Sequence, residues 1–80
     1  MITSSEAEKL AKQKMEEYVN ACGCDAVEDA GNALSKMVCM CGLAMCATVG
    51  QDEAVSRLEE IAAYVAETQT GKHWSIERSQ

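Results

Sequence analysis

Cysteine is the residue type in this chain with the most chemical potential. The chain has five cysteines, and four of them form the C-x-C pairs Cys22/Cys24 and Cys39/Cys41. Thiolates at short spacing can hold zinc or an iron–sulfur cluster. Helical geometry argues against one site built from both pairs, because helical residues two apart point about 160° apart and because Cys24 and Cys39 lie roughly 22 Å apart along a helix. Free cysteines usually behave as small buried hydrophobes. Cys41 is therefore predicted to lie in the core, whereas Cys22 and Cys24 flank a turn and are expected to be partly exposed; a metal-binding or redox protein is an alternative.

Residues typical of an enzyme are not grouped in this sequence. His73 is the single histidine, and it lies beside Trp74 near the end of the chain. Adjacent carboxylates such as Glu59 and Glu60 diverge around a helix, which is typical of a solvated face. The sequence contains no phosphate-binding loop, no H-E-x-x-H motif and no nucleophile elbow. We therefore expect a protein without catalytic activity, cofactor or bound metal.

Charge and hydropathy limit the partners and the compartment. Thirteen acidic and seven basic residues give a net charge of −6, which argues against direct nucleic-acid binding, since that requires a basic surface. The most apolar stretch, residues 37–49, is shorter than the about 20 residues that cross a membrane. The first residues do not resemble a signal peptide. We expect a cytoplasmic protein that binds no membrane and keeps its thiols reduced.

Helices are the elements predicted to position these residues. The chain has no proline and is rich in good helix formers, and its apolar residues recur at helical spacing. Ser5 and Asp25 have the spacing of capping-box residues, and glycines follow each segment. The predicted helices span residues 5–22, 25–49 and 52–70, and residues 71–80 form a tail. Residues 1–80 are therefore predicted to be a single all-α domain, a three-helix up-down-up bundle with short connections.

The second half of the 25–49 segment is predicted to be buried on all sides. Polar residues form one arc of this helix as far as Lys36, and apolar residues replace them from Met37 onward. The two other helices can cover only part of this circumference, and so short a chain forms a marginal core alone. We therefore expect a homodimer completed through this helix. The predicted self-association residues recur at i, i+3, i+4 and i+7: Cys39, Gly42, Leu43 and Cys46.

The third predicted helix carries most of the excess acid. The residues predicted to bind a partner are Asp52, Glu53, Glu59, Glu60 and Glu67. An acidic surface attracts basic partners, so the predicted function is a protein–protein interaction module: an adaptor, a regulator or an inhibitor. In its small size, its acidity and its lack of a catalytic set of residues, the chain looks like small accessory proteins of phages and other mobile elements that act on host machinery. No motif matches a particular family. An acidic nucleic-acid mimic is a further alternative, although basic residues such as Lys9, Lys12, Lys14 and Arg57 dilute its charge.

Overall fold

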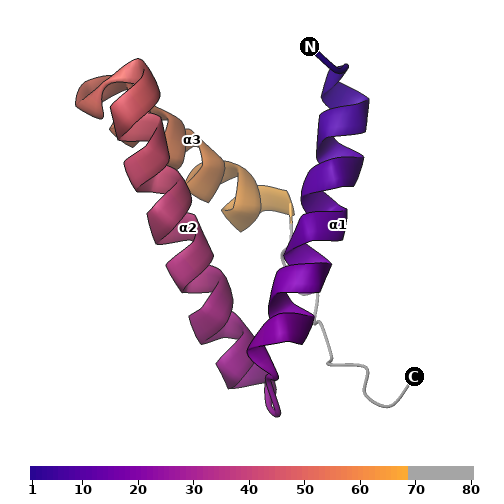
Figure 1. The fold of residues 1–80 in the computed structure, drawn as a ribbon. Helices are drawn as coiled ribbons and strands as arrows, with labels where there is room; N and C mark the ends of the chain where they lie inside the picture. Colours follow the sequence, from indigo (N-terminus) through magenta and orange to yellow (C-terminus); the bar gives the residue numbers. More distant parts are fainter. Residues whose placement is uncertain (69–80) are drawn as a thin grey trace.

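The chain folds into helices throughout its described part. A computed structural model describes residues 1–68, and these contain three helices and no strand: α1 (Ser4–Cys22), α2 (Val27–Val49) and α3 (Gln51–Thr68) (Figure 1). The predicted all-α class is confirmed. The predicted tail, residues 71–80, and the last two residues of the predicted third helix, 69–70, lie outside the described residues.

Helix α1 begins with a capping box, two residues before the predicted position. The Thr3 hydroxyl accepts a hydrogen bond from the Glu6 backbone N–H at 3.1 Å, and the Thr3 backbone N–H donates to Glu6 Oε1 at 2.9 Å. Ser5 was the predicted cap, with Glu8 at the same spacing. The earlier start is favoured because it satisfies the first helical N–H groups and still adds two residues to the helix.

Protonation of Glu6 is expected to weaken the start of α1. Hydrogen bonds from the Thr3 backbone and then its hydroxyl hold the pKa of Glu6 below the ordinary value of 4.5. Because the folded pKa is lowered, this stabilisation is complete above pH 4.5 and is lost as the pH falls through the folded value. Circular dichroism of Glu6→Gln should show a shallower loss of helicity on acidification than the wild type. Glu8→Gln is the matched control, and equal acid profiles for the two variants would contradict this role of Glu6.

Helix α2 begins one residue later than the predicted N-cap implies. Ala26 is its N-cap residue, and no side chain closes a hydrogen bond there. Gly23 ends α1 in the left-handed conformation (φ 67°, ψ 41°), and Ala26 is extended (φ −135°, ψ 160°). Residues 24–26 redirect the chain, so α2 begins at Val27 and its N-cap is Ala26, one residue after the predicted cap Asp25.

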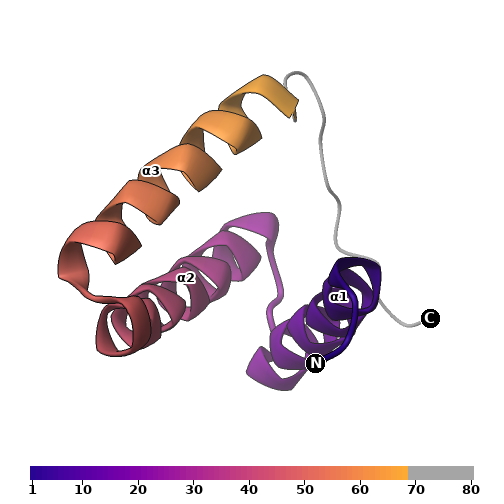
Figure 2. The ribbon, with the colours of Figure 1, turned by 90° about the horizontal axis from the view of Figure 1, so that it is seen from above.

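The three helices form an open arrangement in which α2 contacts both neighbours. α1 and α2 diverge from their connection like the arms of a V, whereas α3 folds back beside α2 (Figures 1 and 2). The Tyr18 hydroxyl ties α1 to α2 by donating to the Ala33 carbonyl oxygen at 2.8 Å. Within residues 1–68, α1 and α3 make no close contact. These residues alone therefore do not form the closed bundle that short connections predict.

Burial along α2 follows the divergence from α1. Ala30, Met37 and Cys41 share one face of α2, and burial decreases along it: Ala30 is 5% exposed, Met37 is half-buried and Cys41 is exposed. Cys41 was predicted to lie in the core. That prediction is wrong because α1 no longer lies beside α2 at that height.

Candidate functional site

The contact between α2 and α3 is centred on a glycine. Gly42 is buried, and a Cβ atom added to it would lie 3.2 Å from Leu58 Cδ1. Cys46, one turn later on the same side of α2, is half-buried, and Ala54 of α3 is fully buried. The structure therefore places Gly42 against α3 of its own chain, whereas Cys39 and Leu43 of the predicted self-association set remain exposed.

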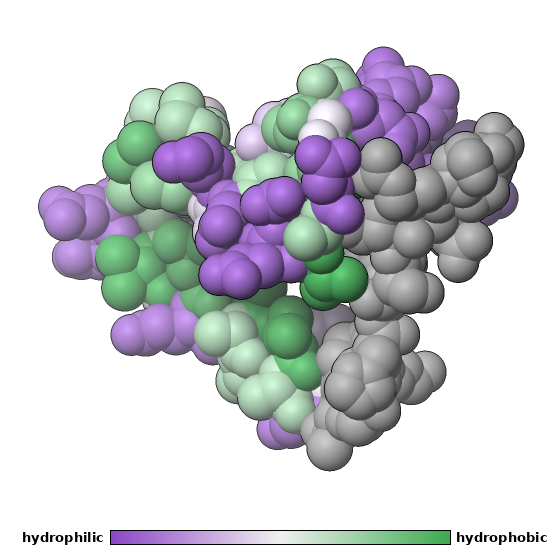
Figure 3. Space-filling view, turned by 90° about the horizontal axis from the view of Figure 1, so that it is seen from below, coloured by the Kyte–Doolittle hydropathy of each residue, from purple (hydrophilic) through white to green (hydrophobic). Residues whose placement is uncertain are grey.

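A strip of apolar residues remains uncovered on α2, at about 60–160° around the helix axis from Gly42. We call it the outer face of α2, and its members follow at helical spacing: Cys39, Met40, Leu43 and Ala47. Met40 is 63% exposed and Leu43 is 59% exposed. Seen from below, hydrophobic side chains lie open at the surface beside hydrophilic ones (Figure 3). The outer face is an apolar surface that this chain does not cover within residues 1–68.

Helix α2 is also long and apolar enough to cross a membrane by length and composition alone. The core helix of a soluble protein meets the same test, but only 6% of the relevant stretch is buried here. Glu28, Asp29 and Lys36 limit the uncharged part to residues 37–49, which is roughly 20 Å long against a hydrocarbon core of about 30 Å. The charged first half of α2 therefore argues against a complete span.

The five predicted partner-binding carboxylates all lie on α3 and are exposed: Asp52, Glu53, Glu59, Glu60 and Glu67. Helical spacing places them within an arc of about 120°, away from the Leu58 side that contacts α2. Arg57 Nε donates to Glu53 Oε2 at 2.8 Å, and both side chains are about half exposed, at 52% and 53%. Such an exposed pair is weak. The arc is therefore a solvated acidic surface that is available to a partner.

An open pocket of about 360 Å³ lies where α1 meets α2. It is lined by Tyr18, Cys22, Gly23, Cys24, Asp29, Asn32, Ala33 and Lys36. The sequence patterns did not indicate this pocket, because it depends on the left-handed turn at Gly23. The one feature of the sequence that could have indicated the pocket is the spacing of Tyr18 and Cys22, which places both side chains on the same side of α1, one helical turn apart.

The pocket does not activate the Cys24 thiol. Burial raises the pKa of the Cys24 thiol, and the neighbouring Cys22, Asp29 and Asp25 raise it further. Burial also raises the pKa of Tyr18, as does its hydrogen bond with Cys22. A reactive cysteine requires a lowered pKa, so the raised pKa argues against Cys24 as a nucleophile.

Comparison with known proteins places the chain in one family. Residues 3–80 match the family described as "Protein of unknown function DUF2620". The chain belongs to this family. No curated protein and no solved structure matches it. The matched range includes almost all of the described part of this DUF2620 chain, so all three helices belong to the family's common sequence.

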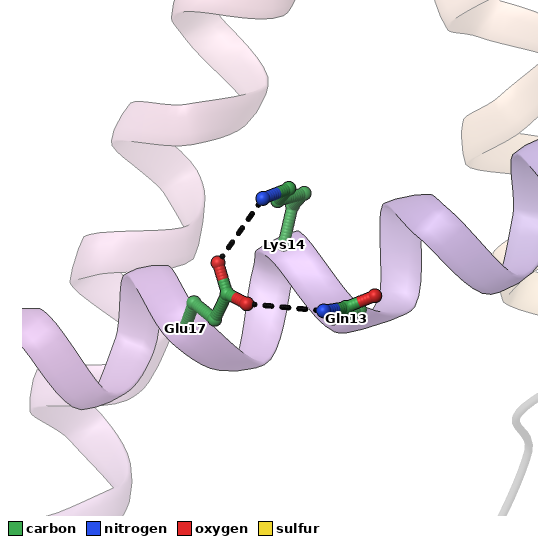
Figure 4. Close-up of polar contacts among 3 residues, drawn as sticks. All are labelled: Gln13, Lys14 and Glu17. Atoms are coloured by element: carbon green, nitrogen blue, oxygen red, sulfur yellow. Dashed lines mark hydrogen bonds and ion pairs between the residues drawn. The ribbon is translucent and has the colours of Figure 1, made fainter.

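The exposed side of α1 in this DUF2620 protein carries a small polar network. Glu17 accepts from Lys14 Nζ at 3.4 Å and from Gln13 Nε2 at 3.3 Å (Figure 4). These residues lie within one helical turn of each other and are exposed, so they support the helix weakly. In residues 1–68 no three cysteine, histidine or carboxylate side chains are grouped as a metal site, and His73 lies outside these residues.

Proposed function

We propose that this DUF2620 protein is a small, non-catalytic protein–protein interaction module that acts as a homodimer. One observation carries the proposal: in residues 1–68 no large side chain is fully buried, and the buried hydrophobic residues are Ala30 and Ala54 alone. Burial of apolar surface is the main favourable contribution to folding. A chain that leaves Met40 and Leu43 in water gains stability when another surface covers them.

A second copy of the same chain fits the outer face of α2. Residues 37–49 carry no charge, so two copies with a net charge of −6 each can approach there without placing like charges in contact. Cys39 and Ala47 are small, which allows two helices to pack closely around Leu43. Two-fold self-association is the commonest form of assembly, and it would supply the cover that α1 and α3 do not provide.

The acidic arc of α3 is the proposed docking surface for a basic partner in the cytoplasm. The carboxylates of the arc point away from the Leu58 contact, so in the proposed dimer they stay in solvent on both copies. An adaptor, regulator or inhibitor of host machinery would use this arc for electrostatic attraction. The outer face and the arc thus have separate roles, assembly and recognition.

Sedimentation of the wild type over a range of concentrations tests the dimer. We expect the mass of two 8.6 kDa chains, with dissociation on dilution. A protein that stays monomeric at high micromolar concentration contradicts the proposal. An assembly that forms only in detergent or lipid would instead support membrane insertion of α2.

Charge reversal on α3 tests the recognition surface. Glu59→Lys with Glu60→Lys should leave the free energy of unfolding within about 0.5 kcal/mol per substitution, as is usual for surface positions. The association rate with a purified basic partner should fall, most strongly at low salt. Glu16→Lys with Glu17→Lys, an adjacent pair on α1, is the matched control. Equal association rates for both variants at every salt concentration would exclude the α3 arc as the docking surface.

A further inference from the structure

The two C-x-C pairs of this chain have different backbone geometry. Cys39 and Cys41 lie inside the continuous helix α2, so their side chains point about 160° apart. Cys22 is the last residue of α1, and the left-handed Gly23 separates it from Cys24. The helical relation between the thiols is therefore broken at Gly23. Cys22 and Cys24 open onto the same pocket, whereas Cys39 and Cys41 do not line it.

We propose that Cys22 and Cys24 form a two-coordinate site for a soft, thiol-seeking monovalent cation of the Cu(I) class. Thiolate ligands select such ions, and a d¹⁰ monovalent ion is stable with two sulfur ligands. Zinc and iron–sulfur centres need more ligands, which residues 1–68 do not bring together. The step is a ligand exchange without oxidation: two S–H bonds break and their protons pass to solvent, while two Cu–S bonds replace the bonds to the ligands that delivered the ion, and these ligands are released.

The surroundings of the pocket suit this exchange. A Cu(I) ion bound by two thiolates carries one negative charge, and Lys36 lines the pocket as a neighbouring cation. Asp29, a carboxylate, also lines the pocket from α2, the same helix as Lys36. The hydrogen bond from the Tyr18 hydroxyl to the Ala33 carbonyl oxygen holds α1 and α2, which form the two sides of the pocket, in a fixed relative position.

The test is competition for Cu(I) between the reduced protein and the chromophoric chelator bicinchoninate, under nitrogen with ascorbate present. We expect one ion per chain. Cys22→Ser and Cys24→Ser should each lower the affinity by more than about 100-fold, because loss of a direct ligand exceeds the effect of losing an outer-shell partner. The matched control, Cys41→Ser, removes an exposed thiol of the other C-x-C pair that is not part of the outer face of α2, and it should bind like the wild type.

Two further measurements keep the result decisive. Circular dichroism checks that the variants retain their helices, and X-ray absorption of the copper-loaded wild type counts the sulfur neighbours without any variant; two are expected. Failure of the wild type to compete overturns the site. Wild-type affinity in Cys24→Ser, an equal loss in the Cys41→Ser control, or one ion for every two chains would also overturn it.

Discussion

Leu43→Glu is expected to leave the three helices intact and to convert the dimer into a monomer. In the single chain Leu43 is 59% exposed, so a glutamate there stays in water at little cost. In the proposed dimer the same carboxylate would be buried without a partner, which costs several kcal/mol. Sedimentation should therefore show the mass of one chain at concentrations at which the wild type is a dimer, and the melting temperature should no longer depend on concentration.

Asn32→Glu is the matched control for this experiment. Asn32 is exposed on the same side of α2, in its polar half, and the substitution adds the same charge. We expect this variant to sediment like the wild type. If Leu43→Glu also keeps the wild-type mass, the interface lies on α1 or α3 instead, and the outer face of α2 has another role.

Gly42→Leu is expected to destabilise the chain by about 1–3 kcal/mol, the usual cost of overpacking a contact. A Cβ atom at this position already lies 3.2 Å from Leu58 Cδ1, so the larger side chain must displace the Leu58 side chain or the helix that carries it. Gly31→Leu is the matched control in the same helix, because nothing lies within 4 Å of its added Cβ. Loss of a helical glycine there should stabilise the chain by roughly 1 kcal/mol. Denaturant unfolding measures both changes.

A second substitution identifies the contact responsible. Leu58→Ala should remove much of the additional cost of Gly42→Leu, since it vacates the space that the new side chain needs. Independent, additive effects of the two substitutions would show that Gly42 does not pack against Leu58. The sequence had suggested that Gly42 lies at the crossing of two copies, and in the structure α3 of the same chain already fills that place.

Local signals predicted the helices well. Helical periodicity and the glycines after Cys22 and Val49 gave the number of helices and the ends of α1 and α2, because these features depend on nearby residues alone. The helix starts were less certain. Thr3 and Ser5 both have a glutamate three residues later, and only the complete fold shows which pair caps α1.

Features that depend on the angle between helices could not be predicted from the sequence. The periodic face that includes Ala30 and Cys41 is continuous in sequence, but α1 covers only its first part. A glycine at position 42 indicates that another helix packs closely there, but it does not show which helix that is. The pocket at Cys22 and Cys24 likewise depends on how the chain turns at Gly23.

Gly50 is the single residue between α2 and α3, and its positive φ of 95° favours glycine. So short a link means that α2 and α3 meet as soon as both helices form, without a long search by the chain. Tight sequence-local pairing of this kind is typical of fast folding. If two copies complete the core, their encounter becomes the slow step, and the rate of assembly in a cell is then set by how much of the protein is made.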